Sequence, residues 1–213
     1  MHPKVIIADD HPIIVAGIQQ IIQNLHTFRI VATAKDGREL LALLDSEACD
    51  ILIIDYSMPQ SGGPDGYPLI EFIKRRYPDI KILLLTMLDN PVMLRNLDAL
   101  GIQGIVSKRD RFNNIASAID MVSRGVNYRS TAIQKLLSPD SSTPNTGHTD
   151  LTAREFEVLR LFAEGLSVSE IADKLNKSVK TVSTQKISAM KKLRVSNDID
   201  LYNAIKTTGM FTR

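Results

Sequence analysis

The chain has 213 residues, of which 44% are hydrophobic and 23% charged, a composition typical of a globular protein with one large domain or two modest ones. No apolar run approaches the roughly 20 residues that a membrane helix needs, and Met1-His2-Pro3-Lys4 has no signal-peptide pattern, so neither membrane insertion nor secretion is expected. Because Cys49 is the single cysteine, an intramolecular disulfide is excluded and a cytoplasmic location is expected.

Charge is unevenly distributed along the chain, although the net charge is only +2. Residues 1–150 hold 15 Lys or Arg against 17 Asp or Glu, whereas residues 151–213 hold 11 against 7. An acidic part joined to a basic one predicts that only the carboxyl-terminal part meets a polyanion such as nucleic acid.

The first 125 residues alternate short apolar runs, rich in β-branched residues, with amphipathic stretches. The runs predict strands at about 5–8, 28–34, 51–54, 80–86 and 104–107. The stretches predict helices at about 12–25, 36–46, 66–76, 91–100 and 111–124. This alternation is typical of an α/β fold with a doubly wound parallel sheet of five strands, whose order the periodicity does not determine.

Polar side chains stand where the predicted strands end. Asp9 and Asp10 follow one strand, Asp55 and Lys108 follow two others, and Thr86 closes a fourth. Carboxyl ends of parallel strands share one edge of the sheet, and three carboxylates there repel one another unless a hard cation such as Mg²⁺ lies among them. Taken singly, a strand-end Asp is more often a helix N-cap and a lone Lys a solvated charge. Together the groups predict a site that forms an aspartyl phosphate.

The pattern of Asp9-Asp10, Asp55, Met58-Pro59, Thr86 and Lys108 makes residues 1–125 resemble the receiver domain of two-component response regulators. The resemblance implies a flavodoxin-like strand order, 2-1-3-4-5. It also implies that Asp55 accepts a phosphoryl group from a histidine kinase or a phosphotransfer protein.

The same resemblance gives the neighbouring groups their roles. Lys108 is expected to pair with Asp55 before transfer and with a phosphoryl oxygen after it. Thr86 is expected to donate a hydrogen bond to another phosphoryl oxygen and so to act as the switch. Mg²⁺ is expected to be held by four residues: Asp9, Asp10, Asp55 and the backbone carbonyl of Ser57.

The sequence departs from the receiver pattern at two places. Ile105 occupies the position, three residues before the Lys, where much of the family has an aromatic residue that swings inward with the Thr. The usual coupling of Thr86 to an aromatic side chain is therefore not carried over. The loop from Gln60 to Pro64 is longer than usual, and it serves either to select a partner or as a tolerated insertion.

Residues 126–150 are expected to form a short helix followed by a flexible linker, because Ser138 to Asp150 contains no apolar residue except two prolines. From residue 151 the pattern is wholly helical. Capping boxes at Thr152–Glu155 and Ser167–Glu170 predict two helix starts, Gly165 ends the first helix, and a third helix is expected at about 179–193.

This short helix, turn and longer helix follow the helix-turn-helix plan, and residues 151–208 resemble the four-helix DNA-binding domain of the LuxR/FixJ/NarL family. A fourth helix at about 197–207 either packs on the domain or forms a two-fold contact. The long loop and the stretches 183–186 and 188–190 resemble one particular regulator of this family. That likeness suggests pairing with auxiliary regulators as well as self-pairing.

The third helix is expected to enter the major groove of DNA. Val182, Ala189, Met190 and Leu193 form its core stripe, with Lys186 on the rim. Ile187 projects away from the core, which suits contact with a thymine methyl. A solvated charged face is the plain alternative for the lysines. The residues expected to contact DNA are Lys180, Thr181, Ser183, Thr184, Lys186, Ile187, Ser188 and Lys191.

Together these features predict a two-component response regulator, a transcription factor controlled by phosphorylation of Asp55. Its expected partners are promoter double-stranded DNA, RNA polymerase and a second copy, and it is not expected to be a turnover enzyme. A haloacid-dehalogenase-type phosphohydrolase is one alternative, but Ser57 stands where that chemistry needs an Asp. A receiver-based dimerisation adaptor that acts largely without phosphorylation is the other.

Overall fold

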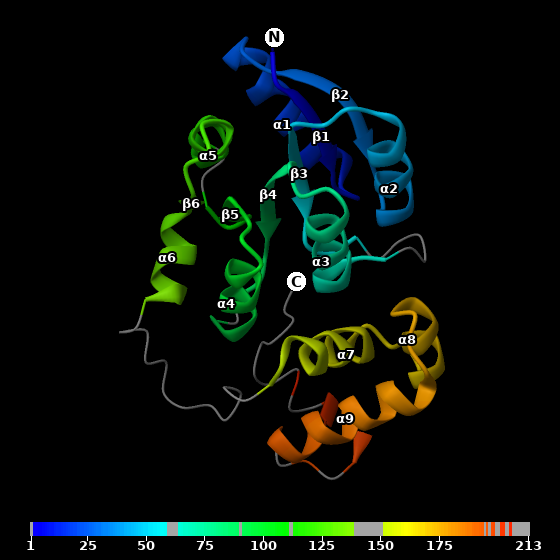
Figure 1. The fold of residues 1–213 in the computed structure, drawn as a ribbon. Coiled ribbons are helices and arrows are strands. Elements are labelled where there is room, and N and C mark those ends of the chain that lie inside the picture. Colours follow the sequence, from blue (N-terminus) through cyan, green and yellow to red (C-terminus); the bar gives the residue numbers. More distant parts are fainter. Residues whose placement is uncertain are drawn as a thin grey trace. The chain divides into compact units, whose positions relative to one another are not determined.

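The structure is a computed structural model, and it describes residues 2–58, 64–89, 91–110, 113–138, 151–193, 195, 197, 198, 201, 202 and 205. The chain divides into two compact units (Figure 1). No helix in these described ranges combines the length and the apolar character needed to cross a membrane.

The first unit is built on one sheet whose pairings are all parallel. Its strands are β1(Lys4–Ala8), β2(Arg29–Ala34), β3(Ile51–Asp55), β4(Lys81–Thr86), β5(Gly104–Ser107) and β6(Tyr128–Arg129). The helices between and after them are α1(Pro12–Leu25), α2(Gly37–Ser46), α3(Gly66–Arg76), α4(Pro91–Ala99), α5(Asn113–Ser123) and α6(Thr131–Leu137). The strand order β2-β1-β3-β4-β5-β6 confirms the doubly wound fold and the order expected for its first five strands.

The core lies on both faces of this sheet, as in other parallel sheets. On one face, Val5 and Ile7 of β1 join Leu83 of β4 in a buried cluster with Ile18 of α1 and Ile119 of α5. The alternate residues of the same strands point to the other face and are also buried. Helices α2 and α3 lie on that other side of the sheet (Figure 1).

The sixth strand, β6, is an addition that the sequence reasoning missed. The Tyr128 amide donates to the Gln103 carbonyl at 2.8 Å, and the Ser130 amide donates to the Ile105 carbonyl at 3.1 Å. Two residues are too few to show an alternating pattern, so no periodic signal marked them. The sheet therefore extends past residue 125, where the first domain was expected to end, and the following helix α6 buries Ile133 completely.

The long connection between β3 and α3 reaches the start of α2. A Cβ atom on Gly37 would lie 1.8 Å from the carbonyl oxygen of Pro64, so only glycine allows this approach. Of the loop expected at 60–64, residues 60–63 lie outside the described residues, as does Pro59.

The second unit contains α7(Ala153–Ala163), α8(Val168–Lys174) and α9(Val179–Leu193), and the division of the chain also assigns Leu88–Asn96, which includes most of α4, to this unit. Both expected capping boxes are present, at Thr152 with Glu155 and at Ser167 with Glu170. Gly165 follows α7 with φ +94°, a conformation that favours glycine. The three helices bury a common core of Val158, Leu161, Ile171, Ala172 and Val182.

The expected fourth helix at 197–207 is described only in part. Asp198, Leu201, Tyr202 and Ile205 have helical geometry. Leu201 and Ile205 are buried and Tyr202 is exposed, so one side of this segment packs on the second unit. The remaining residues of the segment, and the linker residues 139–150, lie outside the described residues.

Candidate functional site

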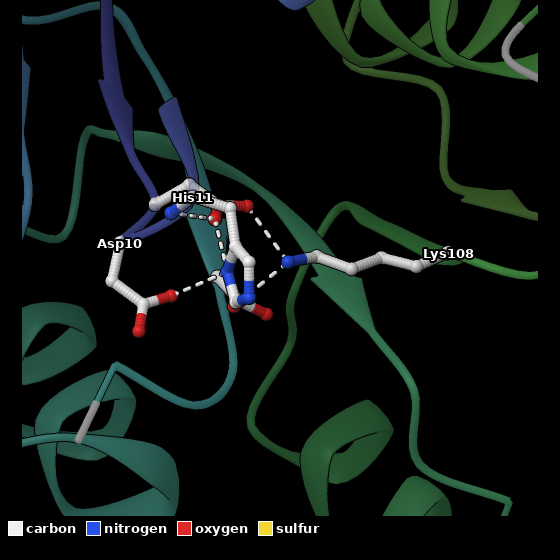
Figure 2. Close-up of polar contacts among 5 residues, drawn as sticks. Asp10, His11 and Lys108 are labelled. Carbon is white, nitrogen blue, oxygen red and sulfur yellow. Dashed lines mark hydrogen bonds and ion pairs between the residues drawn. The ribbon is translucent and has the colours of Figure 1, made fainter. Parts of the chain in front are cut away.

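The acidic residues expected at the strand ends converge at one edge of the sheet. Asp9 follows β1, and Asp55 is the last residue of β3, the strand paired with β1. Asp9, Asp10, His11 and Asp55 each offer a ligand atom, and these atoms all lie within 4.8 Å of one another (Figure 2). Asp9 and Asp55 are buried, so water screens little of their mutual repulsion.

Lys108, the first residue after β5, joins these carboxylates. Its Nζ lies 2.7 Å from Oδ2 of Asp9 and 2.8 Å from Oδ2 of Asp55. Figure 2 shows this side chain reaching in from the side opposite Asp10. The backbone amide of Lys108 donates to the Thr86 carbonyl at 2.8 Å, which ties it to the end of β4.

The pKa values of both ends of this ion pair are displaced by burial and charge. Burial raises the pKa of Asp55 to about 6, helped by the negative charges of Asp9 and Asp10 and opposed by Lys108. Burial by itself lowers the pKa of Lys108, but the two carboxylates beside it outweigh that effect and raise the pKa above its ordinary value.

His11 makes a contact that the sequence reasoning did not expect. It lies at the N-cap position of α1, before Pro12. Its ring Nδ1 also lies 2.7 Å from Oδ1 of Asp10 and 3.2 Å from Oδ1 of Asp9. The only available signal was its place directly after the acid pair. Since 61% of its side chain is exposed, the ring is not enclosed by the site.

The donor set fits a hard divalent cation. Three carboxylates face one ammonium, which leaves an excess of negative charge for a cation to balance. Oδ1 of Asp10 is buried and accepts no hydrogen bond from the described residues, although His11 Nδ1 lies 2.7 Å from it. Carboxylate oxygens are the ligands that Mg²⁺ prefers. Ser57, expected to add its carbonyl, is half-buried two residues beyond Asp55.

Thr86 and Ile105 occupy neighbouring strands behind this edge. Thr86 ends β4 and is fully buried, with Ser107 of β5 as its register partner. Ile105 is also fully buried, in the position where the family pattern has its aromatic residue. This side chain already lies inside, so the inward swing of an exposed aromatic residue has no counterpart in this structure.

The exposed face of α9 is a narrow stripe. Ser178 caps the helix by accepting a hydrogen bond from the Thr181 amide at 3.1 Å. Val182 and Ala189 are buried, whereas Ile187 is 53% exposed, which confirms the predicted direction of its side chain. Four exposed residues follow one another at spacings of four, three and four, so their side chains form one line along the helix. They are Lys180, Thr184, Ile187 and Lys191.

Two family models match this chain. The response regulator receiver domain matches residues 5–120, and the bacterial regulatory proteins of the luxR family match residues 149–205. The transcriptional regulatory protein RcsB of Escherichia coli (strain K12) is 41% identical over 207 residues, which cover 97% of this chain and 95% of that protein. The chain belongs to the response regulators of the luxR family.

Solved structures of relatives support the same assignment. RcsB from Salmonella enterica serovar Typhimurium, bound to promoter P1flhDC in the presence of phosphomimetic BeF3-, has a TM-score of 0.81 and 40% identity, covering 97% of this chain and 100% of that chain. A structure of two RcsB dimers bound to two parallel DNAs has a TM-score of 0.63 and 40% identity, covering 97% of this chain and 99% of that chain. The likeness to one particular regulator, expected from the long loop and α9, is confirmed, and that regulator is RcsB.

This response regulator differs from the sequence-based expectation at two positions of α9. Lys186 is buried, with Nζ 2.7 Å from Oδ2 of Asp198 and 4.3 Å from the centre of the Phe162 ring. Ser188 is half-buried and donates to Oε1 of Glu155 at 2.6 Å. Both side chains are engaged inside the second unit, so we remove them from the predicted DNA contacts. Val179 is 49% exposed at the start of α9, and the sequence-based list of DNA contacts did not include it.

Proposed function

We propose that this response regulator is switched by phosphorylation of Asp55 and binds promoter DNA through α9. The observation that carries the proposal is the contact of Lys108 with both Asp9 and Asp55 at the carboxyl edge of the sheet. It brings an acid pair, a lone Asp and a Lys from three strands into one buried site. This is the arrangement that transfer of a phosphoryl group to a carboxylate requires.

In the proposed reaction, Asp55 attacks the phosphorus atom of a phosphohistidine on a histidine kinase or phosphotransfer protein. A P–O bond to Asp55 forms as the P–N bond breaks, and the imidazole leaves with a proton. Lys108 neutralises one oxygen of the transferred group. Thr86 donates its hydroxyl hydrogen to another oxygen, which draws the end of β4 toward the site. Each chain takes one phosphoryl group, and the protein is not a turnover enzyme.

We propose that Asp9, Asp10 and Asp55, with the carbonyl of Ser57, hold Mg²⁺. The ion supplies the positive charge that balances the phosphoryl oxygens. The proposal is supported by the excess negative charge of the cluster and by the unsatisfied oxygen of Asp10.

Mg²⁺ is expected to raise the melting temperature of the first unit even without phosphorylation. A ligand that binds only the folded state at a hundredfold excess over Kd adds about 2.7 kcal/mol of stability. Asp10→Ala should abolish this shift, whereas Asp79→Ala, a change at an exposed residue away from the cluster, should keep it. Thermal scans with and without Mg²⁺ measure the effect. An unchanged metal response in Asp10→Ala places the ion elsewhere.

We propose that the DNA-bound form is a homodimer, with pairing to auxiliary regulators and contact with RNA polymerase as further interactions. One α9 reads only a few base pairs, so useful affinity needs two copies on neighbouring half-sites. The proposal is supported by RcsB, for which dimers bound to DNA are described. We place the protein in the cytoplasm, with residues 1–125 as the core of the receiver and 151–213 as the DNA-binding domain. Residues 126–150 join them and begin with β6 and α6.

Phosphorylation followed by a mass measurement in solution tests this proposal. Incubation of the full chain with acetyl phosphate and Mg²⁺ should add one phosphoryl group and convert monomers to dimers in light scattering. A receiver that acts as an adaptor without phosphorylation predicts dimers that are independent of the phosphodonor. Phosphorylation with no change of mass in solution would favour that alternative.

Lys180 and Ile187 are expected to differ in what they read. We assign Lys180, with Lys191, to DNA phosphates, and Ile187, with Thr184, to base edges. Lys180→Ala should weaken binding to all sequences alike and reduce the salt slope by about one. Ile187→Ala should cost about 1 kcal/mol or more at one A·T pair, with little effect of salt, because a thymine methyl contact is lost.

Binding titrations against single-base operator variants at several salt concentrations separate these effects. Each variant serves as the control for the other, since both residues lie on the same exposed stripe of α9. If Lys180→Ala alters base preference and Ile187→Ala alters only the salt dependence, the proposed orientation of α9 in the groove is wrong.

A further inference from the structure

Ser130 connects β5, the strand that Lys108 follows, to helix α6. It lies between β6 and α6 and is fully buried. Its amide donates to the Ile105 carbonyl at 3.1 Å, and its Oγ accepts a hydrogen bond from the Ser107 amide at 3.1 Å. Its carbonyl accepts from the Gln134 amide at 2.8 Å, which starts the first turn of α6. One residue thus contacts both β5 and α6.

Ser130 is hydrogen-bonded to the end of β5, directly before Lys108. Ser107 directly precedes Lys108, whose amide is bonded in turn to the Thr86 carbonyl on β4. The Ser107 amide is buried and has Ser130 Oγ as its hydrogen-bond acceptor. A displacement of Lys108 or of the end of β4 therefore changes the Ser107–Ser130 hydrogen bond, since rigid strands transmit small shifts to the groups bonded to them.

The segment around Ser130 is anchored well enough to respond as a unit. The Arg129 guanidinium donates from Nε to Oδ1 of Asp98 at 2.7 Å and from Nη2 to the Ile102 carbonyl at 2.7 Å. Gln134 donates from Nε2 to the Arg129 carbonyl at 2.8 Å, and Ile133 is fully buried. These contacts hold α6 to the edge of the sheet, so that a change at Ser130 is not absorbed by a loose connection.

We propose that Ser130 is a positioning residue that reports the state of Lys108 to α6. The inference rests on the proposed phosphorylation of Asp55. Ile105 has no aromatic ring to move, but its carbonyl and the amide of Ser107 are both bonded to Ser130, so the backbone of β5 provides the connection. The receiver match ends at residue 120, before this segment. Beyond α6 the chain continues into residues 139–150 and then the DNA-binding domain.

Hydrogen exchange of the full chain with Mg²⁺ and beryllofluoride, an analogue of the phosphoryl group, tests the proposal. In the wild type, exchange of residues 131–137 should change about twofold or more when beryllofluoride binds. In Ser130→Ala, beryllofluoride should bind within about threefold of the wild-type affinity, because no atom of the site is removed, while the change in α6 is lost. Ser117→Ala, at an exposed serine of α5, should behave as the wild type.

A response of α6 that persists in Ser130→Ala overturns the inference, as does wild-type protein that binds beryllofluoride with no change in α6. Failure of the wild type to bind beryllofluoride instead overturns the proposed function. A merely structural role of Ser130 would alter exchange of α6 in the unliganded variant but leave its change on binding intact. If Ser130→Ala does not fold, titration of the wild type by NMR decides. The Ser107 amide and the α6 amides should shift together, and an unmoved Ser107 amide beside a shifted α6 contradicts the proposal.

Discussion

Asp55→Asn is expected to take up no phosphoryl group from acetyl phosphate and Mg²⁺, whereas the wild type gains the mass of one. Asp55 is the better nucleophile of the two carboxylates that contact Lys108. Both oxygens of Asp9 are engaged, Oδ1 by the His11 amide at 2.9 Å and Oδ2 by Lys108. Asp55 contacts Lys108 through Oδ2 alone, at 2.8 Å. An amide in place of this carboxylate is a poor nucleophile.

Intact-protein mass spectrometry measures the uptake. Asp79→Asn is the matched control, because it makes the same chemical change at an exposed residue away from the acid cluster. It should label as the wild type does. Equal labelling of Asp55→Asn would move the phosphorylation site to another residue.

Glu155→Ala is expected to destabilise the DNA-binding domain by about 2 kcal/mol or more, since a capping box and a buried charged partner are lost together. The Glu155 carboxylate accepts from the Thr152 amide at 2.7 Å and from Ser188 Oγ at 2.6 Å, and it pairs with Lys192 Nζ at 2.7 Å. These contacts tie α9 to the start of α7. Their loss should therefore weaken DNA binding as well as stability.

The same carboxylate predicts a pH dependence. Burial alone would raise the pKa of Glu155, but hydrogen bonds from Lys192, Ser188 and Thr152 outweigh it and bring the pKa from 4.5 to about 2. Because the pKa is lowered in the folded state, the stabilisation is fully present above pH 4.5 and is lost as pH falls toward 2. Hydrogen exchange of α9 in the full chain follows this loss. Glu155→Gln keeps an acceptor for Thr152 and should lack this part of the pH dependence; an unchanged acid profile would contradict the assignment.

The acid site could be predicted from the sequence because each of its groups closes a strand. Asp9, Asp55 and Lys108 each follow a short apolar run, and parallel strands bring such ends together by geometry alone. The His11 ring was missed because a residue at a helix start gives no signal of which way its side chain turns. Strand β6 was missed because two residues are too few to show the alternation of a strand. Without β6, nothing in the sequence indicated that Ser130 contacts β5.

The errors on α9 have a different physical origin. A helical projection gives the angle of each side chain but not what another helix places opposite it. Lys186 was set on the rim of the core, yet Asp198 and Phe162 draw its ammonium inward. Ser188 was set on the outer face, yet Glu155 of α7 accepts its hydroxyl hydrogen. These partners, Asp198, Phe162 and Glu155, lie outside α9, so the periodicity of α9 could not predict the contacts.

The most direct test asks whether phosphorylation of Asp55 controls DNA binding. The affinity of the full chain for an operator fragment is measured with and without acetyl phosphate and Mg²⁺. A change in population between two states typically alters affinity by about tenfold, or roughly 1.4 kcal/mol. The wild type should show a rise of this size on phosphorylation, and Asp55→Asn should show none. An affinity that rises equally in both proteins, or that rises in neither although the wild type carries the phosphoryl group, would contradict the switch.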